Sequence, residues 1–535
     1  MGFLVGGYND QIFILWQSWC MNAEGAFNAT SFCSYYAYPY GIDINVFYSQ
    51  PILWGVFFLL ARVLGGVTAY NILIFLGGAL GLLFSYLLFR KWFSFYVSVS
   101  LALSYALSSY FFVHVGSHVD LSQIWVFPAF LLIFLKAIRS QKLTYYLFSG
   151  LFISVTLLIS NYYGYFLYLL SLLFFFIEVI KPEVFRNGKK LLWKVFAFAV
   201  MGISSLIVAI PFVTPYFRAN FISNTQDSLE ENKLKVVRPI EDFFIFSSRP
   251  WHFLLPSTRN PFFGKFSEEV ISQLERKDYF LFKNYFHDEH AGLFLGLSNL
   301  LLMIFSVYLF FKSQVELKDR EVMLKMLFVL FMLILFSFPP YFAVSQSKIY
   351  LPSYALYLFF PMFRVLSRLG VIILLVTLFI SGFGLSYIEK KIPNILFLII
   401  LLLLTSFGLV QSFVPVRLTN VSVTPPVFTF LRYNTSKDSV IAVYPYTEGN
   451  KVLFWMREHQ RRFANPRGFH IGDFDSAEFT SKLKTDEGLD DARISGINYL
   501  LVFKSSSAAS LHFFKGSEQI RLLKEFDDSY IYTFN

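Results

Sequence analysis

The chain has 535 residues, of which 56% are hydrophobic and only 15% are charged. Soluble globular proteins have about half apolar and a quarter charged residues, so this composition excludes an ordinary soluble enzyme and indicates a membrane protein. The net charge is +10, and nearly all of the excess lies before residue 415, beside apolar segments, which favours cytoplasmic loops over nucleic-acid binding.

The first element in chain order is a polar patch, Gly6-Gly7-Tyr8-Asn9-Asp10, ahead of a helical-looking stretch at 11–21. Asp10 is either the N-cap of that helix or a carboxylate that acts as a general base or holds a cation. Residues 1–8 lack the basic and apolar regions of a signal peptide, so an internal segment must insert the protein. The apolar stretch Pro51–Leu64 is too short to span, which predicts a helix along the membrane surface.

Ten apolar stretches approach the length of about 20 residues that crosses a bilayer. They are residues 67–90, 94–113, 120–137, 143–162, 163–180, 191–216, 291–312, 323–342, 367–387 and 392–414. Lys and Arg gather in every second turn, at 90–91, 136–142, 181–194, 312–325 and 390–391, which places those turns in the cytoplasm.

This topology places four segments outside the cytoplasm: 1–66, 217–290, 343–366 and 415–535. An N-terminus outside is unusual, so we expect that a first helix is missing. Segment 343–366 is broken by prolines and is expected to be re-entrant or interfacial. Segment 415–535 is richer in charge, with strand-like runs at 439–444, 499–503 and 530–534 and a helix-like run at 453–463, which predicts a small extracytoplasmic α/β domain.

Two clusters of titratable residues lie in the predicted outer turns. His114 and His118 are four residues apart, so on a helix they share a face and could bind a divalent ion, and Asp120 caps the next span. The alternative is a turn that simply meets water. Glu289, beside His287, Asp288 and His290, is either a carboxylate that reaches a shared cavity or part of a solvated loop end.

The remaining candidates are basic and aromatic. Arg364 and Arg368, four residues apart, either clamp a phosphate from one helix face or snorkel toward lipid head groups. Tyr162 and Tyr163 indicate an interfacial aromatic belt or a surface on which a carbohydrate stacks. The only cysteines, Cys20 and Cys33, both fall outside, where a disulfide is allowed.

An ordered series of short motifs resembles the GT-C superfamily of integral membrane glycosyltransferases, and within it the YfhO-like bacterial membrane proteins. The series is Gly7-Tyr8-Asn9-Asp10 with Trp16 and Trp19, Tyr38-Pro39-Tyr40-Gly41, Ala69-Tyr70-Asn71, Gly116-Ser117-His118, Ser160-Asn161-Tyr162-Tyr163-Gly164, Pro361-Met362-Phe363-Arg364 with Ser367-Arg368, and Gly496-Ile497-Asn498-Tyr499-Leu500-Leu501-Val502. The resemblance covers nearly the whole chain. It implies a polytopic helical fold of about ten spans with interfacial helices and an outer α/β domain.

The resemblance also implies a function. A sugar would move from a polyprenyl-phosphate donor to a glycan, lipid or protein acceptor of the cell envelope at the outer face of a bacterial plasma membrane. Asp10 would be the general base, His118 and Asp120 the second polar group, and Arg364 and Arg368 the phosphate ligands. No cofactor is called for except, at most, a divalent cation, and the sequence has no nucleotide-binding glycine motif. A transporter of lipid-linked sugars and a non-catalytic envelope assembly protein are the alternatives.

Overall fold

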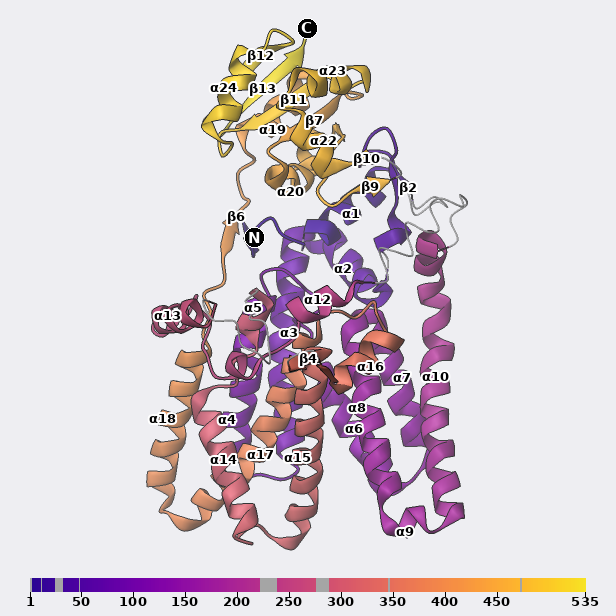
Figure 1. Cartoon of the computed structure of the whole chain (residues 1–535), viewed down its shortest axis with the longest axis vertical. Coiled ribbons are helices and arrows are strands. Elements are labelled where there is room, and N and C mark those ends of the chain that lie inside the picture. The colour runs from indigo at the N-terminus through magenta and orange to yellow at the C-terminus, as the bar shows by residue number, and fades with distance from the viewer. Residues whose placement is uncertain are drawn as a thin grey trace.

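The computed structural model describes residues 2–10, 12–24, 32–47, 49–221, 238–275, 288–344, 347–471 and 474–535. Long helices form a lower layer and a β-sheet forms an upper layer, with the N-terminal segment between them (Figure 1).

A helix overlaps each of the ten apolar stretches. The helices are α3 (Gly66–Phe89), α4 (Phe95–Ala106) continued by α5 (Ser109–His114), α6 (Val126–Ser140), α7 (Leu143–Ile159), α8 (Asn161–Ile180), α10 (Gly188–Phe221), α14 (Leu297–Phe311), α15 (Leu317–Ser337), α17 (Gly370–Lys391) and α18 (Asn394–Ser412). Six helical stretches in the described ranges are long and apolar enough to cross a membrane: Gly66–Phe89, Phe95–His114, Asn161–Ile180, Gly188–Pro215, Leu366–Lys391 and Asn394–Ser412.

Helix α17 is the centre of the lower layer. In its most apolar stretch 94% of the residues are buried, and it packs against α4, α14 and α15. A helix that is apolar on every side is expected to be surrounded by protein or lipid, and here the protein surrounds it. Short helices connect or flank the long ones: α2 (Pro51–Leu64), α9 (Pro182–Phe185), α12 (Ile240–Ile245), α13 (Gly264–Glu275) and α16 (Pro352–Phe359).

The stretch 323–342 does not remain helical to its end. Helix α15 stops at Ser337, and β4 (Tyr341–Val344) and β5 (Ser347–Tyr350) form an antiparallel pair before α16. The cause is Pro339 and Pro340, because the residue before a proline is driven to an extended conformation, as Phe338 is at φ −75° and ψ 168°. The expected re-entrant segment is therefore a hairpin followed by a short helix.

The C-terminal part contains a five-stranded sheet in the order β12-β13-β11-β7-β8. Its strands are β7 (Val440–Tyr444), β8 (Arg462–Phe463), β11 (Tyr499–Phe503), β12 (Ile520–Glu525) and β13 (Ser529–Phe534). β7 is parallel to β8 and β11, and both central strands are almost fully buried, as their continuous apolar sequences predict. The helices of this part are α19 (Pro426–Asn434), α20 (Gly449–Phe454), α21 (Met456–His459), α22 (Ser476–Lys482), α23 (Asp486–Ile494) and α24 (Ala508–Gly516).

All three predicted strands are present, but the helix predicted at 453–463 is only partly correct. Helices α20 and α21 are short, and α21 ends at His459, because the backbone of the next residue, Gln460, is left-handed at φ 50°. The chain then becomes β8, in which Arg462 pairs with Val440. Pairing with a distant strand has overridden the local helical pattern.

The N-terminal segment joins the two layers. Strand β1 (Phe3–Val5) pairs with β6 (Leu418–Asn420), and α1 (Ile12–Ala23) packs on α20 and α21, where the Trp16 indole donates to the sulfur of Met456 at 3.3 Å. Short strands β2 (Phe32–Cys33) and β3 (Ile42–Asp43) follow, and a disulfide joins Cys20 to Cys33. One hydrophobic cluster runs from the long helices into the sheet, so the first outer segment is a structural part of the upper layer.

Candidate functional site

Two adjoining cavities lie between the helices and the C-terminal part. The arginine cavity, of about 410 Å³, is lined by Asp10, His118, Glu289 and three arginines, Arg259, Arg417 and Arg467. The amide cavity, of about 580 Å³, is lined by polar and aromatic side chains that include Asp10, Gln17, Gln50, Trp54, His118 and Asp120. Asp10, Ser117 and His118 line both cavities, so they form the wall at which the two meet.

Asp10 presents an open carboxylate at this wall. It is exposed at the start of α1, and the first amides of the helix donate instead to the backbone carbonyls of Asn9 and Asp10, each at 3.1 Å. Among the described residues, no group forms a hydrogen bond or ion pair with the Asp10 side chain, so the carboxylate does not serve as a helix cap there. It is free to meet a ligand in either cavity.

Asp120 belongs to the amide cavity alone and is held in place. Its carboxylate accepts hydrogen bonds from Ser160 Oγ at 2.9 Å and from Gln50 Nε2 at 3.2 Å. Ser160 lies just before α8 and Gln50 just before α2, so three separate segments fix this side chain. The orientation of the second carboxylate is therefore set before any ligand arrives.

Glu289 is the centre of a buried charge network. It lies in a short 3₁₀ helix, Asp288–Gly292, and accepts hydrogen bonds from Arg368 Nη2 at 2.7 Å and from His114 Nε2 at 2.9 Å. The other ring nitrogen of His114 faces the carbonyl of Tyr110 at 2.7 Å, so both nitrogens of His114 face acceptors. Burial alone would raise the pKa of Glu289, but Arg368 and His114 outweigh it and hold that pKa well below its usual range.

His118 borders this network and faces the cavities. Its Nε2 lies 3.8 Å from Glu289 Oε1. Burial and the charge of Arg368 lower the pKa of His118 below its usual range, although three nearby carboxylates oppose the shift. The imidazole is therefore neutral at pH 7 and can accept a proton or a hydrogen bond from a ligand.

The structure does not bring Arg364 and Arg368 onto one helix face. Residue 364 lies before the 3₁₀ helix Leu366–Leu369, and its guanidinium pairs with Asp242 of α12, whereas Arg368 pairs with Glu289. The prediction that Arg364 and Arg368 share one α-helix face is therefore wrong, because this segment is not α-helical. The phosphate role of the two arginines stays a prediction.

The two tyrosines are placed differently. The ring of Tyr162 lies under the Arg368 guanidinium, 4.6 Å from ring centre to Cζ, and thus beside the Glu289 network. Tyr163 is fully buried, and its hydroxyl donates to the Leu121 carbonyl at 2.5 Å. Tyr163 lines neither cavity and supports the turn that carries Asp120.

Sequence reasoning missed most of the residues that line the cavities, among them four arginines, Arg238, Arg259, Arg417 and Arg467, and two glutamines, Gln17 and Gln50. The four arginines are far apart in sequence and form no motif. They also lie in long predicted outer segments, to which the rule on the charge of short loops does not apply.

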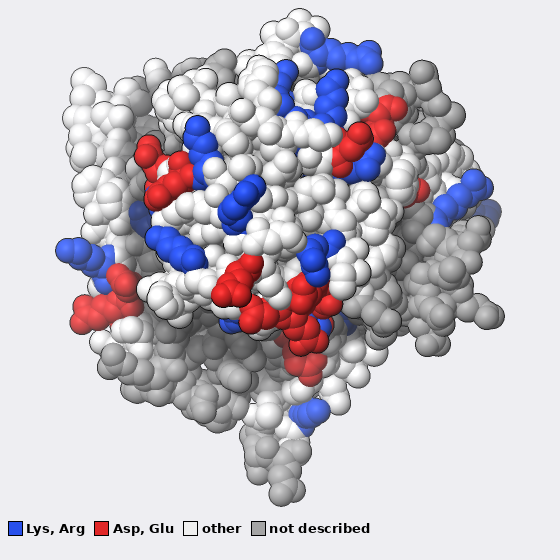
Figure 2. Space-filling model, turned by 90° about the horizontal axis from the view of Figure 1, so that it is seen from above, with Lys and Arg blue, Asp and Glu red and all other residues white. Residues whose placement is uncertain are grey.

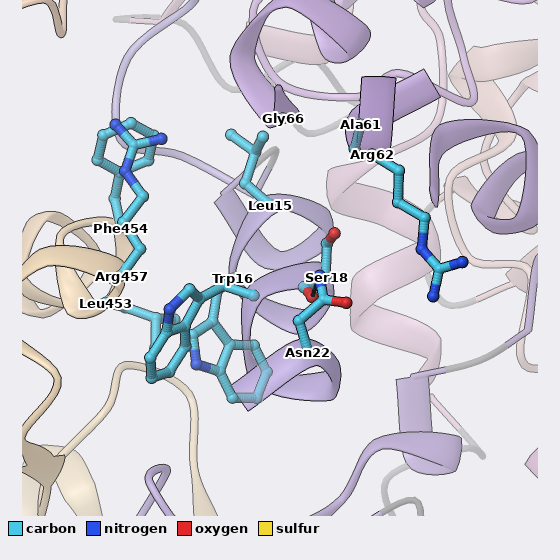
Figure 3. Close-up of a pocket in the computed structure, with 11 residues that line it drawn as sticks. Leu15, Trp16, Ser18, Asn22, Ala61, Arg62, Gly66, Leu453, Phe454 and Arg457 are labelled. Carbon is cyan, nitrogen blue, oxygen red and sulfur yellow. Dashed lines mark hydrogen bonds between the residues drawn. The ribbon is translucent and has the colours of Figure 1, made fainter. Parts of the chain in front are cut away.

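A third cavity, of about 190 Å³, lies between α1, α2 and α20 and is separate from the other two (Figure 3). Its wall contains Trp16, Arg62 and Phe454, and the Arg457 guanidinium lies over the Phe454 ring at 4.4 Å. Among the described residues, its lining contains no Asp or Glu.

The described part of the chain contains no group of three or more His, Cys, Asp or Glu side chains arranged to hold a metal ion. His114 and His118, predicted as a metal pair, are instead linked by Glu289. The divalent cation stays a prediction without a ligand set among these residues. His287 lies outside the described residues.

Basic and acidic side chains are interspersed over the upper face of the molecule, as Figure 2 shows. A protein that binds a nucleic-acid backbone presents a continuous basic stripe. The face drawn in Figure 2 presents no such stripe among the described residues.

The Glu289 network predicts acid sensitivity. The folded-state pKa of Glu289 lies below the value of about 4.3 for an unfolded glutamate. Its ionised form therefore stabilises the fold in full above that value, and the stabilisation is lost as the pH falls through the folded-state pKa. Thermal unfolding measured from about pH 7 to about pH 3 should show a smaller loss for Glu289→Gln than for the wild type. Parallel curves for the two proteins would contradict the assignment.

No protein-family model matches the chain, and no curated protein sequence matches it. Several solved structures share its fold, among them the following three. The arabinofuranosyltransferase AftD from Mycobacteria matches with a TM-score of 0.61 and 13% identity, over 100% of this chain and 38% of that one. An oligosaccharyltransferase from Archaeoglobus fulgidus, tethered with an acceptor peptide, matches with a TM-score of 0.52 and 14% identity, over 99% of this chain and 70% of that one.

ArnT from Cupriavidus metallidurans, bound to undecaprenyl phosphate, matches with a TM-score of 0.51 and 12% identity, over 99% of this chain and 94% of that one. This chain thus spans well under half of AftD and nearly all of ArnT. Identities this low establish the fold and not the activity. These three structural neighbours are GT-C glycosyltransferases, and the chain shares their fold.

Proposed function

We propose that this protein is a membrane glycosyltransferase that moves a sugar from a polyprenyl-phosphate donor to a hydroxyl group of a cell-envelope acceptor. The observation that carries the proposal is the meeting of the arginine cavity and the amide cavity at Asp10, Ser117 and His118. Glycosyl transfer needs positive charge where the phosphate leaves and a base where the hydroxyl attacks. In this proposal the arginines of the arginine cavity supply the positive charge, and Asp10 at the shared wall supplies the base.

In the proposed reaction, the Asp10 carboxylate takes the proton of the acceptor hydroxyl as its oxygen attacks the anomeric carbon of the donor sugar. The bond from that carbon to the phosphate oxygen breaks, and the lipid phosphate leaves with the electron pair. Arg259, Arg417 and Arg467 stabilise the developing negative charge, because cationic groups fixed in place need no reorganisation during the reaction.

The remaining predicted residues take supporting roles in this proposal. The pair of Arg368 and Glu289 holds His114 and His118 at the wall, and Tyr162 lies against that pair. Asp120 orients the acceptor from the amide cavity. Arg364 is proposed to act on the donor side, and Tyr163 acts through the turn that it supports.

We also propose the orientation. The chain would cross a bacterial plasma membrane ten times through 67–414, with 217–290 and 343–366 as outer segments. Residues 1–66 and an α/β domain at 415–535 would lie outside the cytoplasm, as in the YfhO-like group. A disulfide within 1–66 favours this side, because disulfides persist in oxidising compartments.

Thiol labelling tests the orientation. Both native cysteines are bonded to each other, so the wild type serves as an unlabelled background. In intact cells, an impermeant maleimide should label Asp438→Cys, whose side chain is 86% exposed, and should label Lys190→Cys only after the cells are opened. Labelling of position 190 in intact cells would invert the topology.

The function itself is tested with the purified protein in nanodiscs. Transfer of radiolabelled sugar from a panel of polyprenyl-phosphate sugars to envelope extracts should give a labelled product that depends on both substrates. Uptake or translocation of the donor with no labelled product would support the transporter instead.

A further inference from the structure

Gln17 is a buried amide without partners. The residue is 0% exposed, and within the described ranges neither its amide oxygen nor its amide nitrogen forms a hydrogen bond. Most buried polar groups in native proteins have at least one partner, so an amide with two orphaned atoms requires an explanation. An apolar side chain of the same length would avoid this cost.

Helix α1 directs Gln17 toward the amide cavity. Asp10, Phe13, Ile14 and Gln17 recur at the spacing of one helix face, and all four line that cavity. The opposite face of α1 carries Leu15, Trp16 and Ser18, which Figure 3 shows at the third cavity. The helix therefore separates two cavities, and Gln17 lies on the side of the one that contains Asp10.

The other side chains of the amide cavity define the kind of ligand. The Asp120 carboxylate and the Gln50 amide are already joined at 3.2 Å, Trp54 adds an aromatic surface, and Asp10 and Arg238 add one charge of each sign. Amides, an aromatic ring and charged groups of both signs suit a neutral polyhydroxyl compound, since each hydroxyl both donates and accepts. The arginine cavity, by contrast, suits an anion.

We propose that Gln17 determines specificity by hydrogen bonding to the hydroxyl groups of a neutral sugar in the amide cavity. The amide nitrogen donates to one hydroxyl oxygen, and the amide oxygen accepts from a neighbouring hydroxyl. That this sugar is the acceptor in a transfer reaction rests on the proposed function. That it binds in the amide cavity does not. A site built on an unsatisfied amide discriminates against a ligand that lacks the hydroxyl, because the amide then stays unpaired.

The substitution Gln17→Met tests the proposal by two effects of opposite direction. It removes the orphaned amide at nearly constant length, so the Tm of the free protein should stay the same or rise. The probes are methyl glycosides of common hexoses and pentoses. At least one of them should raise the Tm of the wild type, and its affinity for Gln17→Met should be about 10- to 100-fold weaker.

Gln411→Met is the matched control. Gln411 is equally buried and lies at the end of α18, but its amide oxygen accepts a hydrogen bond from the Leu297 amide at 3.1 Å. The same change there should lower the Tm and leave glycoside affinity unaltered. A clear fall in the Tm of free Gln17→Met would show a structural role and overturn the proposal, as would the absence of any glycoside effect on the wild type.

The outcome is separable from that of the proposed function. Asp10→Asn should keep the glycoside effect on Tm even though transfer is lost. If transfer survives in Asp10→Asn while Gln17→Met loses glycoside affinity, the catalytic assignment fails and the sugar site stands.

Discussion

Replacing Asp10 by asparagine should lower the turnover number for sugar transfer by about 10²–10⁴-fold while the protein still folds. An amide cannot take the proton from the attacking hydroxyl, whereas the shape of the side chain is kept. Little stability should be lost, because the Asp10 carboxylate is exposed and has no hydrogen-bond partner among the described residues. The measurements are the turnover number with purified protein in nanodiscs and the Tm of the same sample.

Asp438→Asn provides the matched control, since the Asp438 side chain is 86% exposed and lines neither cavity. Its turnover should equal that of the wild type. Full transfer activity in Asp10→Asn would exclude Asp10 as the base. It would also favour the transporter or the assembly protein, neither of which needs a proton acceptor at that position.

Removing the Arg368 guanidinium should lower the free energy of unfolding by about 3–5 kcal/mol. Arg368→Ala leaves the Glu289 carboxylate, whose side chain is only 11% exposed, without its closest cation. Isolated buried charge is costly, and the loss includes the contact with Tyr162. Unfolding followed by tryptophan fluorescence in detergent measures the change.

The paired substitution identifies the cause. Glu289→Gln in the Arg368→Ala background should recover part of the lost stability, because the uncompensated charge is removed. Lys390→Ala, which breaks the exposed pair with Glu316, should have no measurable effect. If Arg368→Ala and Lys390→Ala unfold alike, the Glu289 network does not stabilise the fold.

Much of the lower layer could be predicted because lipid exposure leaves a strong local pattern. Long apolar stretches identified the positions of the long helices in the described ranges, whereas the topology that the alternating basic turns predict stays a prediction. The exceptions are local conflicts: Pro339 and Pro340 ended α15 early, and the pairing of Arg462 with Val440 replaced a helical pattern with β8. Pairing partners that are far apart in sequence leave no periodic signal.

The site was predictable in part for the same reason. Asp10, His118 and Asp120 stood out because charged or titratable groups are rare beside apolar stretches. The ion pairs around the site could not be predicted, because they join residues that are far apart in sequence. Arg364 pairs with Asp242, and Arg368 pairs with Glu289. Gln17 could not be identified from the sequence, because a single glutamine within a helix is common. Its unusual feature is the lack of hydrogen-bond partners, which only the structure shows.

The antiparallel match of Phe3 with Asn420 has a consequence for biogenesis. Asp10 lies directly before helix α1, which rests on α20 and α21, and these are synthesised more than four hundred residues later. Until α20 and α21 have been made, α1 lacks the surface on which it packs, the arginine cavity lacks Arg467 and the amide cavity lacks Gly468. A chain that stops before them would contain the long helices without the complete cavities.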